Sequence, residues 1–79
     1  MRQQVKAEEI HQVVEVILGI PEVQPEDRLI EDLRAESVDI VNLVAALEDR
    51  YNLSISEEAL ADLRTVDDLV GLIQQQPQA

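Results

Sequence analysis

The N-terminal third of the chain alternates apolar and polar residues with the period of an amphipathic helix. Its apolar positions are separated by one, three or four residues: Ile10, Val13, Val14 and Ile17. Gly19 and Pro21 follow as a stop signal, because glycine tolerates a left-handed backbone and proline cannot continue a helix. The pattern predicts a first helix from about residue 3 to residue 18.

Residues 19–36 show no sustained period and are predicted to form a long loop, with a short helical turn near Leu29 to Leu33. A loop of this length in so small a chain indicates a functional segment, although a plain connector is also possible. A second helix is predicted from Ser37 to about Arg50. Its core stripe comprises Ile40, Leu43, Val44, Leu47 and Tyr51. Val38, Asn42, Ala45 and Asp49 share the opposite side, which is either a partner-binding face or an ordinary solvated one.

The C-terminal third carries two further helix starts. Asn52 ends the second helix, and Ser56 followed by two acids caps a short helix to about Leu63. Thr65 and Asp68 have the spacing of a capping box that opens a last amphipathic helix. The sequence therefore predicts an all-α bundle of three main helices and one short one, as a single domain over residues 1–73. Residues 74–79 are rich in Gln and are expected to be disordered.

Composition narrows the choice of function. The 79 residues carry a net charge of −11, which repels nucleic acid and anionic membranes and attracts proteins with basic patches. No Cys is present, His11 has no second metal ligand of its type, and no paired acid and base suggest an enzyme. No signal peptide or membrane-spanning run follows Met1, so a cytosolic protein is expected. We also expect it to be a monomer. Any thiol chemistry would need a prosthetic group.

Ser37 is the candidate functional residue because it stands where the long loop becomes a helix, between Glu36 and Asp39. A helix start offers unpaired backbone N–H groups and the positive end of the helix dipole, which stabilise an anion such as a phosphate ester. For an arbitrary serine in this position the common explanation is structural, since its hydroxyl caps the helix. Both interpretations remain open on these residues alone.

From Asp32 onward the sequence resembles the acyl carrier proteins, aligning with them without gaps. The matching positions are Asp32-Leu33, Ser37, Val41, Leu43-Val44, Ala46-Leu47-Glu48, Tyr51, Ile55, Glu57-Glu58, Thr65-Val66, Leu69 and Ile73. The resemblance implies a four-helix fold and a 4′-phosphopantetheine arm, transferred from coenzyme A to Ser37 by a phosphopantetheinyl transferase. The arm would carry acyl groups as thioesters to partner enzymes that have basic patches. The implied partner-contacting residues are Glu36, Val38, Asp39, Val41, Asn42, Ala45, Glu48 and Asp49.

Four positions depart from the family pattern. Glu36 and Val38 replace the usual Asp and Leu beside the serine, Arg34 stands at a common Gly position, and Asn42 stands at a frequent acidic one. These departures favour a specialised lipid or secondary-metabolite pathway over bulk fatty-acid synthesis. Two alternatives are an aminoacyl or peptidyl carrier, and an acidic helical interaction module that is never modified.

Overall fold

Four helices build the part of the chain that the structure, a computed structural model, describes, residues 5–76. They are α1 (Ala7–Leu18), α2 (Ser37–Tyr51), α3 (Glu57–Ala61) and α4 (Val66–Gln75). Between residues 5 and 76 the one β-type pairing is an isolated bridge joining Arg28 to Thr65. The predicted all-α bundle of three longer helices and one short helix is confirmed. None of the described helices is long and apolar enough to cross a membrane.

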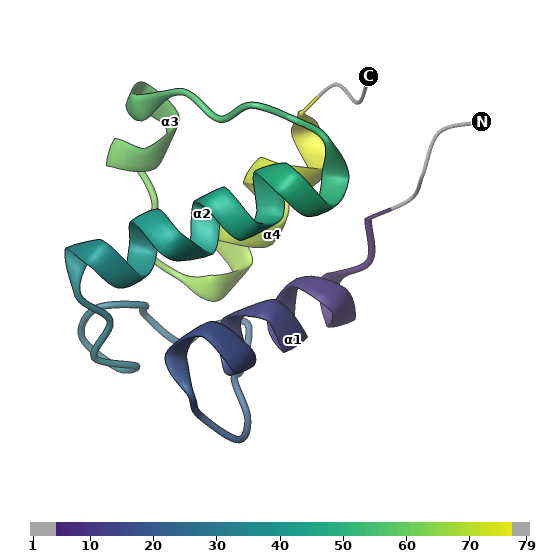
Figure 1. Cartoon of the computed structure of the whole chain (residues 1–79). Coiled ribbons are helices and arrows are strands. Elements are labelled where there is room, and N and C mark those ends of the chain that lie inside the picture. The colour runs from purple at the N-terminus through teal and green to yellow at the C-terminus, as the bar shows by residue number, and fades with distance from the viewer. Residues whose placement is uncertain (1–4, 77–79) are drawn as a thin grey trace.

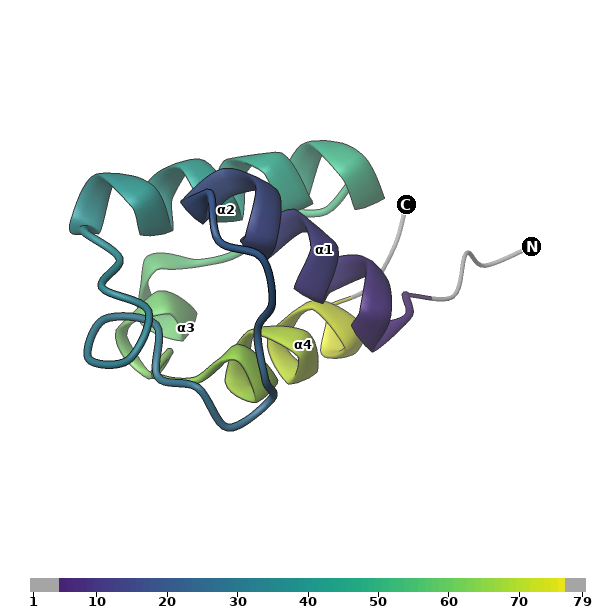
Figure 2. The same ribbon diagram turned by 90° about the horizontal axis from the view of Figure 1, so that it is seen from below.

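The core lies where α1, α2 and α4 face one another, while α3 covers one end (Figure 1). In the view from below, α1 crosses beside α2, and α4 lies on the opposite side of the core from α2 (Figure 2). Each long helix contributes two or more side chains with no exposed surface: Ile10, Val14, Leu43, Leu47, Val66, Leu69 and Ile73. Burying branched apolar side chains is the main force that holds so small a domain together.

A polar contact ties α1 to the end of α2. The Tyr51 ring is buried in the core, and its hydroxyl donates a hydrogen bond to Glu9 Oε1 at 2.8 Å. Burial, together with the hydrogen bond to the Glu9 carboxylate, raises the pKa of the Tyr51 hydroxyl above its ordinary value. The prediction that Tyr51 belongs to the core is confirmed, and its hydroxyl is hydrogen-bonded to Glu9.

The long loop between α1 and α2 is attached to the body through Leu29, which is buried. The Leu29 N–H donates to Arg64 O at 2.8 Å, and the Ala35 N–H donates to Leu29 O at 2.9 Å. Two further backbone bonds, from Val66 N–H to Asp27 O and from Asp67 N–H to Pro25 O, join the loop to the start of α4. The loop therefore holds the beginning of α2 close to the segment that joins α3 to α4.

The helix boundaries agree with the sequence patterns in part. Gly19 and Asn52 end α1 and α2 in the left-handed conformation, with φ of 69° and 53°, as predicted. Among the described residues the first helix begins at Ala7, and Lys6 before it has an extended backbone and makes no side-chain capping hydrogen bond. The predicted start falls in residues 1–4, which lie outside the described residues.

The predicted boundary of the C-terminal tail was wrong for its first residues. Gln74 and Gln75 belong to α4, and the Gln74 side-chain amide donates to Val5 O at 3.1 Å. This contact ties the last turn of α4 to the N-terminal segment, and the helix continues two residues beyond Ile73, its last apolar residue. Residues 77–79, for which disorder was also predicted, lie outside the described residues.

Candidate functional site

The start of α2 is capped by carboxylates, so its serine is not the capping residue. Glu36 is the N-cap, with an extended backbone, and Ser37 is the first residue of the helix. The Glu36 N–H donates to Asp39 Oδ2 at 2.9 Å, which is half of a capping box. The structural explanation of Ser37, a hydroxyl that caps the helix, is therefore wrong for this chain.

The Ser37 hydroxyl is exposed at the end of a helix of 15 residues. Among residues 5–76 it accepts or donates no hydrogen bond, and the backbone N–H groups of Ser37 and Val38 have no backbone partner. Unpaired N–H groups of this kind, together with the positive end of the helix dipole, make a helix start favourable for a negative charge. The position is suited to an anion, and above all to a phosphate ester of Ser37 itself.

An apolar groove opens directly beside Ser37, and we call it the Ser37 groove. It has a volume of about 210 Å³ and is lined by Leu29, Ile30, Ser37, Ile40, Leu60 and Leu63. Pockets for whole small molecules usually measure roughly 300–1,000 Å³, so this groove fits a short apolar segment rather than a complete ligand. It is assembled by the long loop, the first turn of α2 and the region of α3.

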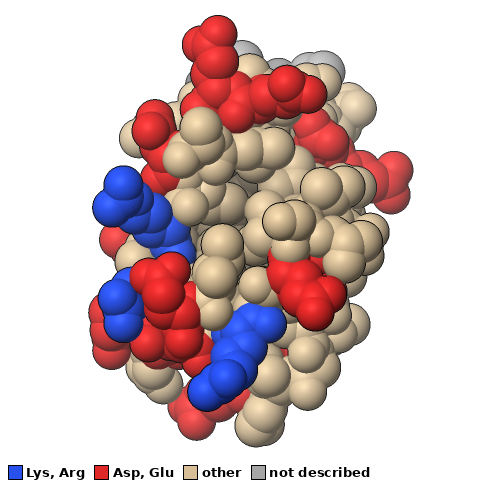
Figure 3. Space-filling view, turned by 90° about the vertical axis from the view of Figure 1, so that its left-hand side faces the viewer, with Lys and Arg blue, Asp and Glu red and all other residues tan. Residues whose placement is uncertain are grey.

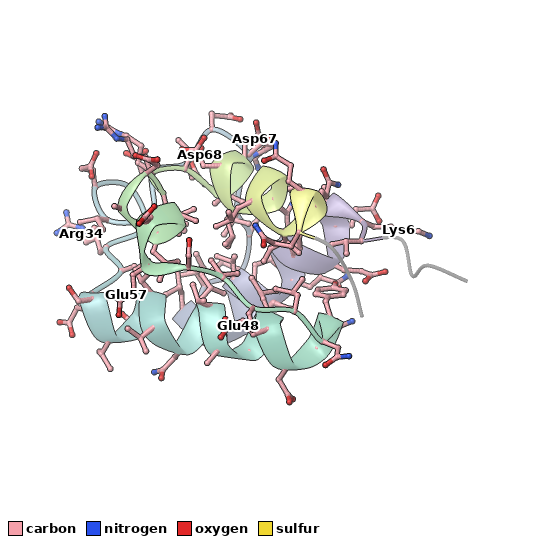
Figure 4. All side chains as sticks on the ribbon, turned by 90° about the horizontal axis from the view of Figure 1, so that it is seen from above. Lys6, Arg34, Glu48, Glu57, Asp67 and Asp68 are labelled. Carbon is pink, nitrogen blue, oxygen red and sulfur yellow. The ribbon has the colours of Figure 1, made fainter. Side chains whose placement is uncertain are left out.

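The loop residue Arg34 has a backbone conformation that is unusual for its type. Its φ is 61°, in the left-handed region, and a side chain with a Cβ atom pays about 1–2 kcal/mol there. Hydrogen bonds on both sides impose the reversal, since Leu33 N–H donates to Arg28 O at 3.0 Å and Ala35 N–H donates to Leu29 O at 2.9 Å. Arg34 projects from the end of the molecule where α2 begins (Figure 4).

Most of the predicted partner face of α2 is exposed. Val38 and Val41 are 57% and 61% exposed, which is high for large apolar side chains and typical of surfaces that meet a partner. Asn42, Ala45 and Asp49 are also exposed on this helix, as is Glu36 just before it. Figure 3 looks at the end of the molecule where α2 begins, and much of the middle of this view is uncharged, with acidic and basic side chains around it.

Glu48 and Asp39 do not lie freely on that face. Glu48 is half-buried and its Oε2 accepts the N–H of Ile55 at 2.7 Å, which ties α2 to the segment leading into α3 (Figure 4). Asp39 is half-buried and caps α2 through its bond to the Glu36 N–H. Glu36 is exposed, but its side chain also belongs to the capping box with Asp39. Of the four predicted carboxylates, Asp49 is therefore the one that the described residues do not use to cap or tie a helix.

Several residues at this end of the molecule were not predicted as site residues. Leu60 and Leu63 complete the Ser37 groove, and Ile30 in the groove wall is 57% exposed. In the sequence, the spacing of three between Leu60 and Leu63 was the one signal that these two side chains share a face. Glu57 and Glu58, interpreted as helix-start acids and as positions that match the family, are exposed at the start of α3, the helix that contributes Leu60 to the groove.

Comparison with known proteins identifies a family for this arrangement. Residues 8–73 match the family model described as the phosphopantetheine attachment site. An acyl carrier protein from Helicobacter hepaticus is 47% identical over 53 residues, which make up 67% of this chain and 70% of the relative. A meromycolate extension acyl carrier protein from Mycobacterium tuberculosis is 39% identical over 67 residues, 82% of this chain, and the match spans only 58% of that relative.

The fold supports the same assignment. A solved structure described as an acyl carrier protein, also from Mycobacterium tuberculosis, superposes with a TM-score of 0.81 at 25% sequence identity. The superposition covers 85% of this chain and 92% of that one. The chain therefore belongs to the acyl carrier proteins, which are carriers rather than catalysts and hold a covalently attached 4′-phosphopantetheine group.

Proposed function

We propose that Ser37 is the residue to which the phosphopantetheine arm is attached. The observation that carries the proposal is the unused, exposed hydroxyl at the first residue of α2, in a helix start that Glu36 and Asp39 cap without it. A hydroxyl that the fold does not need can be esterified at little cost in stability. The first-turn N–H groups suit the phosphate that would result.

In the attachment reaction the carrier contributes the Ser37 hydroxyl. The bond that forms joins Ser37 Oγ to the phosphorus of the arm. The pyrophosphate P–O bond of coenzyme A breaks and releases 3′,5′-ADP, and the hydroxyl proton leaves to a base of the transferase. The attached arm supplies a terminal thiol on which acyl groups travel as thioesters. The chain contains no Cys, so it offers no competing thiol of its own.

The Ser37 groove gives the carrier a place to shelter part of its cargo. It begins at the attachment residue and is walled mainly by Leu and Ile side chains. Each methylene removed from water there would contribute about 0.8 kcal/mol. At about 210 Å³ the groove suits a short apolar stretch next to the thioester, with the rest of a long chain held by the partner enzyme.

We infer that partner enzymes dock over the start of α2. The exposed apolar residues Val38, Val41 and Ala45 form the centre of the contact, and Glu36 and Asp49 attract basic patches at its edge. Because Asp39 and Glu48 are used by the fold, apolar contact contributes more to this docking than the sequence alone suggested. The partners are a phosphopantetheinyl transferase and acyl-transferring, condensing or modifying enzymes.

The pathway and setting follow as further parts of the proposal. We propose a monomeric, cytosolic carrier, with residues 1–73 as its one domain, that serves a specialised lipid pathway. The departures at Arg34, Glu36, Val38 and Asn42 support the specialised role, as does the likeness to carriers of meromycolate extension.

The direct test is incubation of the purified chain with coenzyme A and a broad-specificity phosphopantetheinyl transferase, followed by intact-mass measurement. We expect the wild type to gain the mass of one arm and Ser37→Ala to gain none. A known carrier modified in the same tube confirms that the transferase is active. If the wild type then keeps its original mass, the unmodified interaction module is the better explanation.

A further inference from the structure

Arg34 keeps a backbone conformation that glycine would adopt without strain. Its φ of 61° places it in the left-handed region, between two backbone hydrogen bonds that fix the turn. Nothing in that turn requires an arginine, because the closing bonds are made by the backbone of Leu33 and Ala35. The backbone conformation therefore does not explain the arginine, and its side chain is the part that can have a role.

Within residues 5–76 the Arg34 guanidinium is exposed and has no ion pair or side-chain hydrogen bond. Arg28 in the same loop behaves differently, since its guanidinium lies 3.3 Å from Glu31 and 3.2 Å from Asp32. In a chain with a net charge of −11, an arginine that pairs with no carboxylate of its own fold is available to another anion.

A phosphate on the oxygen of Ser37 would be such an anion, three residues along the chain. Three residues span at most about 11 Å, a gap that a long arginine side chain can reduce to contact distance. On the assumption that Ser37 carries the arm, as proposed above, we propose that Arg34 binds the phosphodiester that joins the arm to Ser37. Arg34 is a positioning residue in this role and takes no part in bond making.

The charges around Ser37 explain why the phosphodiester would benefit from a cation. Glu36 and Asp39 flank the serine, and both repel a phosphate group. A guanidinium offers two parallel N–H donors to two phosphate oxygens, while the N–H groups at the start of α2 approach from the helix side. Held from both directions, the first atoms of the arm would leave the protein in a preferred direction.

The proposal can be tested by NMR on the modified protein, with four variants. Arg34→Gln removes the charge. Arg34→Gly removes the charge and also the strain of a left-handed backbone at a residue with a Cβ atom. Arg34→Lys keeps the charge but lacks the two parallel N–H donors of the guanidinium. Arg50→Gln removes a charge at the other end of α2, about 20 Å away, and is the matched control. The readouts are the ³¹P resonance of the phosphodiester and the Nε–H resonances of the arginines before and after modification.

We expect attachment of the arm to shift the Arg34 Nε–H resonance and leave that of Arg50 in place. The ³¹P resonance should move in Arg34→Gln and Arg34→Gly, stay in Arg50→Gln, and lie between these positions in Arg34→Lys. The difference between wild type and Arg34→Gln should shrink at about 1 M salt, where charges are screened within about 3 Å. This proposal alone would be overturned if, with the arm attached, the Arg34 Nε–H resonance of the wild type stayed in place and the ³¹P resonance were the same in wild type and Arg34→Gln. A wild type that gains no arm would overturn both proposals.

Discussion

At the start of α4 the hydroxyl of Thr65 accepts the N–H of Asp68 at 3.0 Å, and Asp68 accepts the N–H of Thr65 at 3.1 Å. At the start of α2 the hydroxyl of Ser37 stands one residue further into the helix, and carboxylates cap in its place. Ser56 at the start of α3 follows the pattern of α4, with its Oγ accepting the N–H of Ala59. Two of these three hydroxyls are hydrogen-bonded within the fold, and the third, that of Ser37, has no hydrogen bond among residues 5–76.

The comparison teaches that a polar side chain is a better candidate for function when the fold makes no use of it. The same distinction separates two adjacent carboxylates on α2. Glu48 is engaged by the Ile55 N–H at 2.7 Å, whereas Asp49 is exposed on the partner face. Substitutions at used and unused groups should therefore separate stability from function.

The largest loss of stability is expected for Glu48→Lys. The change removes a hydrogen bond to a charged group, leaves the Ile55 N–H without its acceptor and puts a cation in a half-buried position. We expect a loss of about 2–3 kcal/mol in the free energy of unfolding, measured by urea denaturation. Asp49→Lys is the matched control, expected to change stability by less than about 0.5 kcal/mol.

The Asp49→Lys variant, which should hardly change stability, should change the rate of acyl transfer to a partner enzyme. Asp49→Lys should slow transfer while the protein stays folded, and the difference from wild type should narrow as salt is raised. Unchanged transfer kinetics for Asp49→Lys would remove this carboxylate from the docking face.

At the start of α4, Asp68→Ala and Thr65→Ala should give graded losses. Asp68 Oδ2 accepts the N–H groups of both Arg64 and Thr65, so its removal should cost about 2 kcal/mol. Thr65→Ala removes one cap bond and should cost about 1 kcal/mol, which lowers the melting temperature by roughly 4–8 °C. Both variants should still accept the arm. A Thr65→Ala protein as stable as wild type would remove the contrast between the two helix starts.

The smallest effect on stability is expected for Ser37→Ala. Because the Ser37 hydroxyl caps nothing within the described residues, the free energy of unfolding should change by less than about 0.5 kcal/mol, and alanine is a good helix former. Urea denaturation of unmodified proteins measures this directly. A loss near 1 kcal/mol would mean that the hydroxyl does support the helix start.

The sequence predicted those features that depend on neighbouring residues. Gly19 and Asn52 as helix ends, and Ser56 and Thr65 as caps, are local devices and were found where expected. Contacts between distant residues were not predictable in this way. The bond of Gln74 to Val5, which extends α4, joins residues 69 positions apart.

The candidate site shows the same division. The position of Ser37 at a helix start follows from local pattern, but a shift of one residue decides whether its hydroxyl is the cap, and only the structure resolves that shift. Glu48 appeared to be a surface acid because the Ile55 N–H that engages it comes from the following connection. The Ser37 groove needs the loop, α2 and the region of α3 together, so its walls at Leu60 and Leu63 escaped the sequence pattern.

The most direct test of the account is to locate the arm on the chain after modification. The chain has three serines, one threonine and one tyrosine, and the hydroxyls of Ser56, Thr65 and Tyr51 are hydrogen-bonded within the fold. Of the two that remain, Ser37 stands at a helix start and Ser54 lies in the connection before α3. Fragmentation of the modified protein in the mass spectrometer should place the whole arm on Ser37, with Thr65→Ala modified to the same extent as wild type. An arm found on any other hydroxyl, or still gained by Ser37→Ala, would contradict the account.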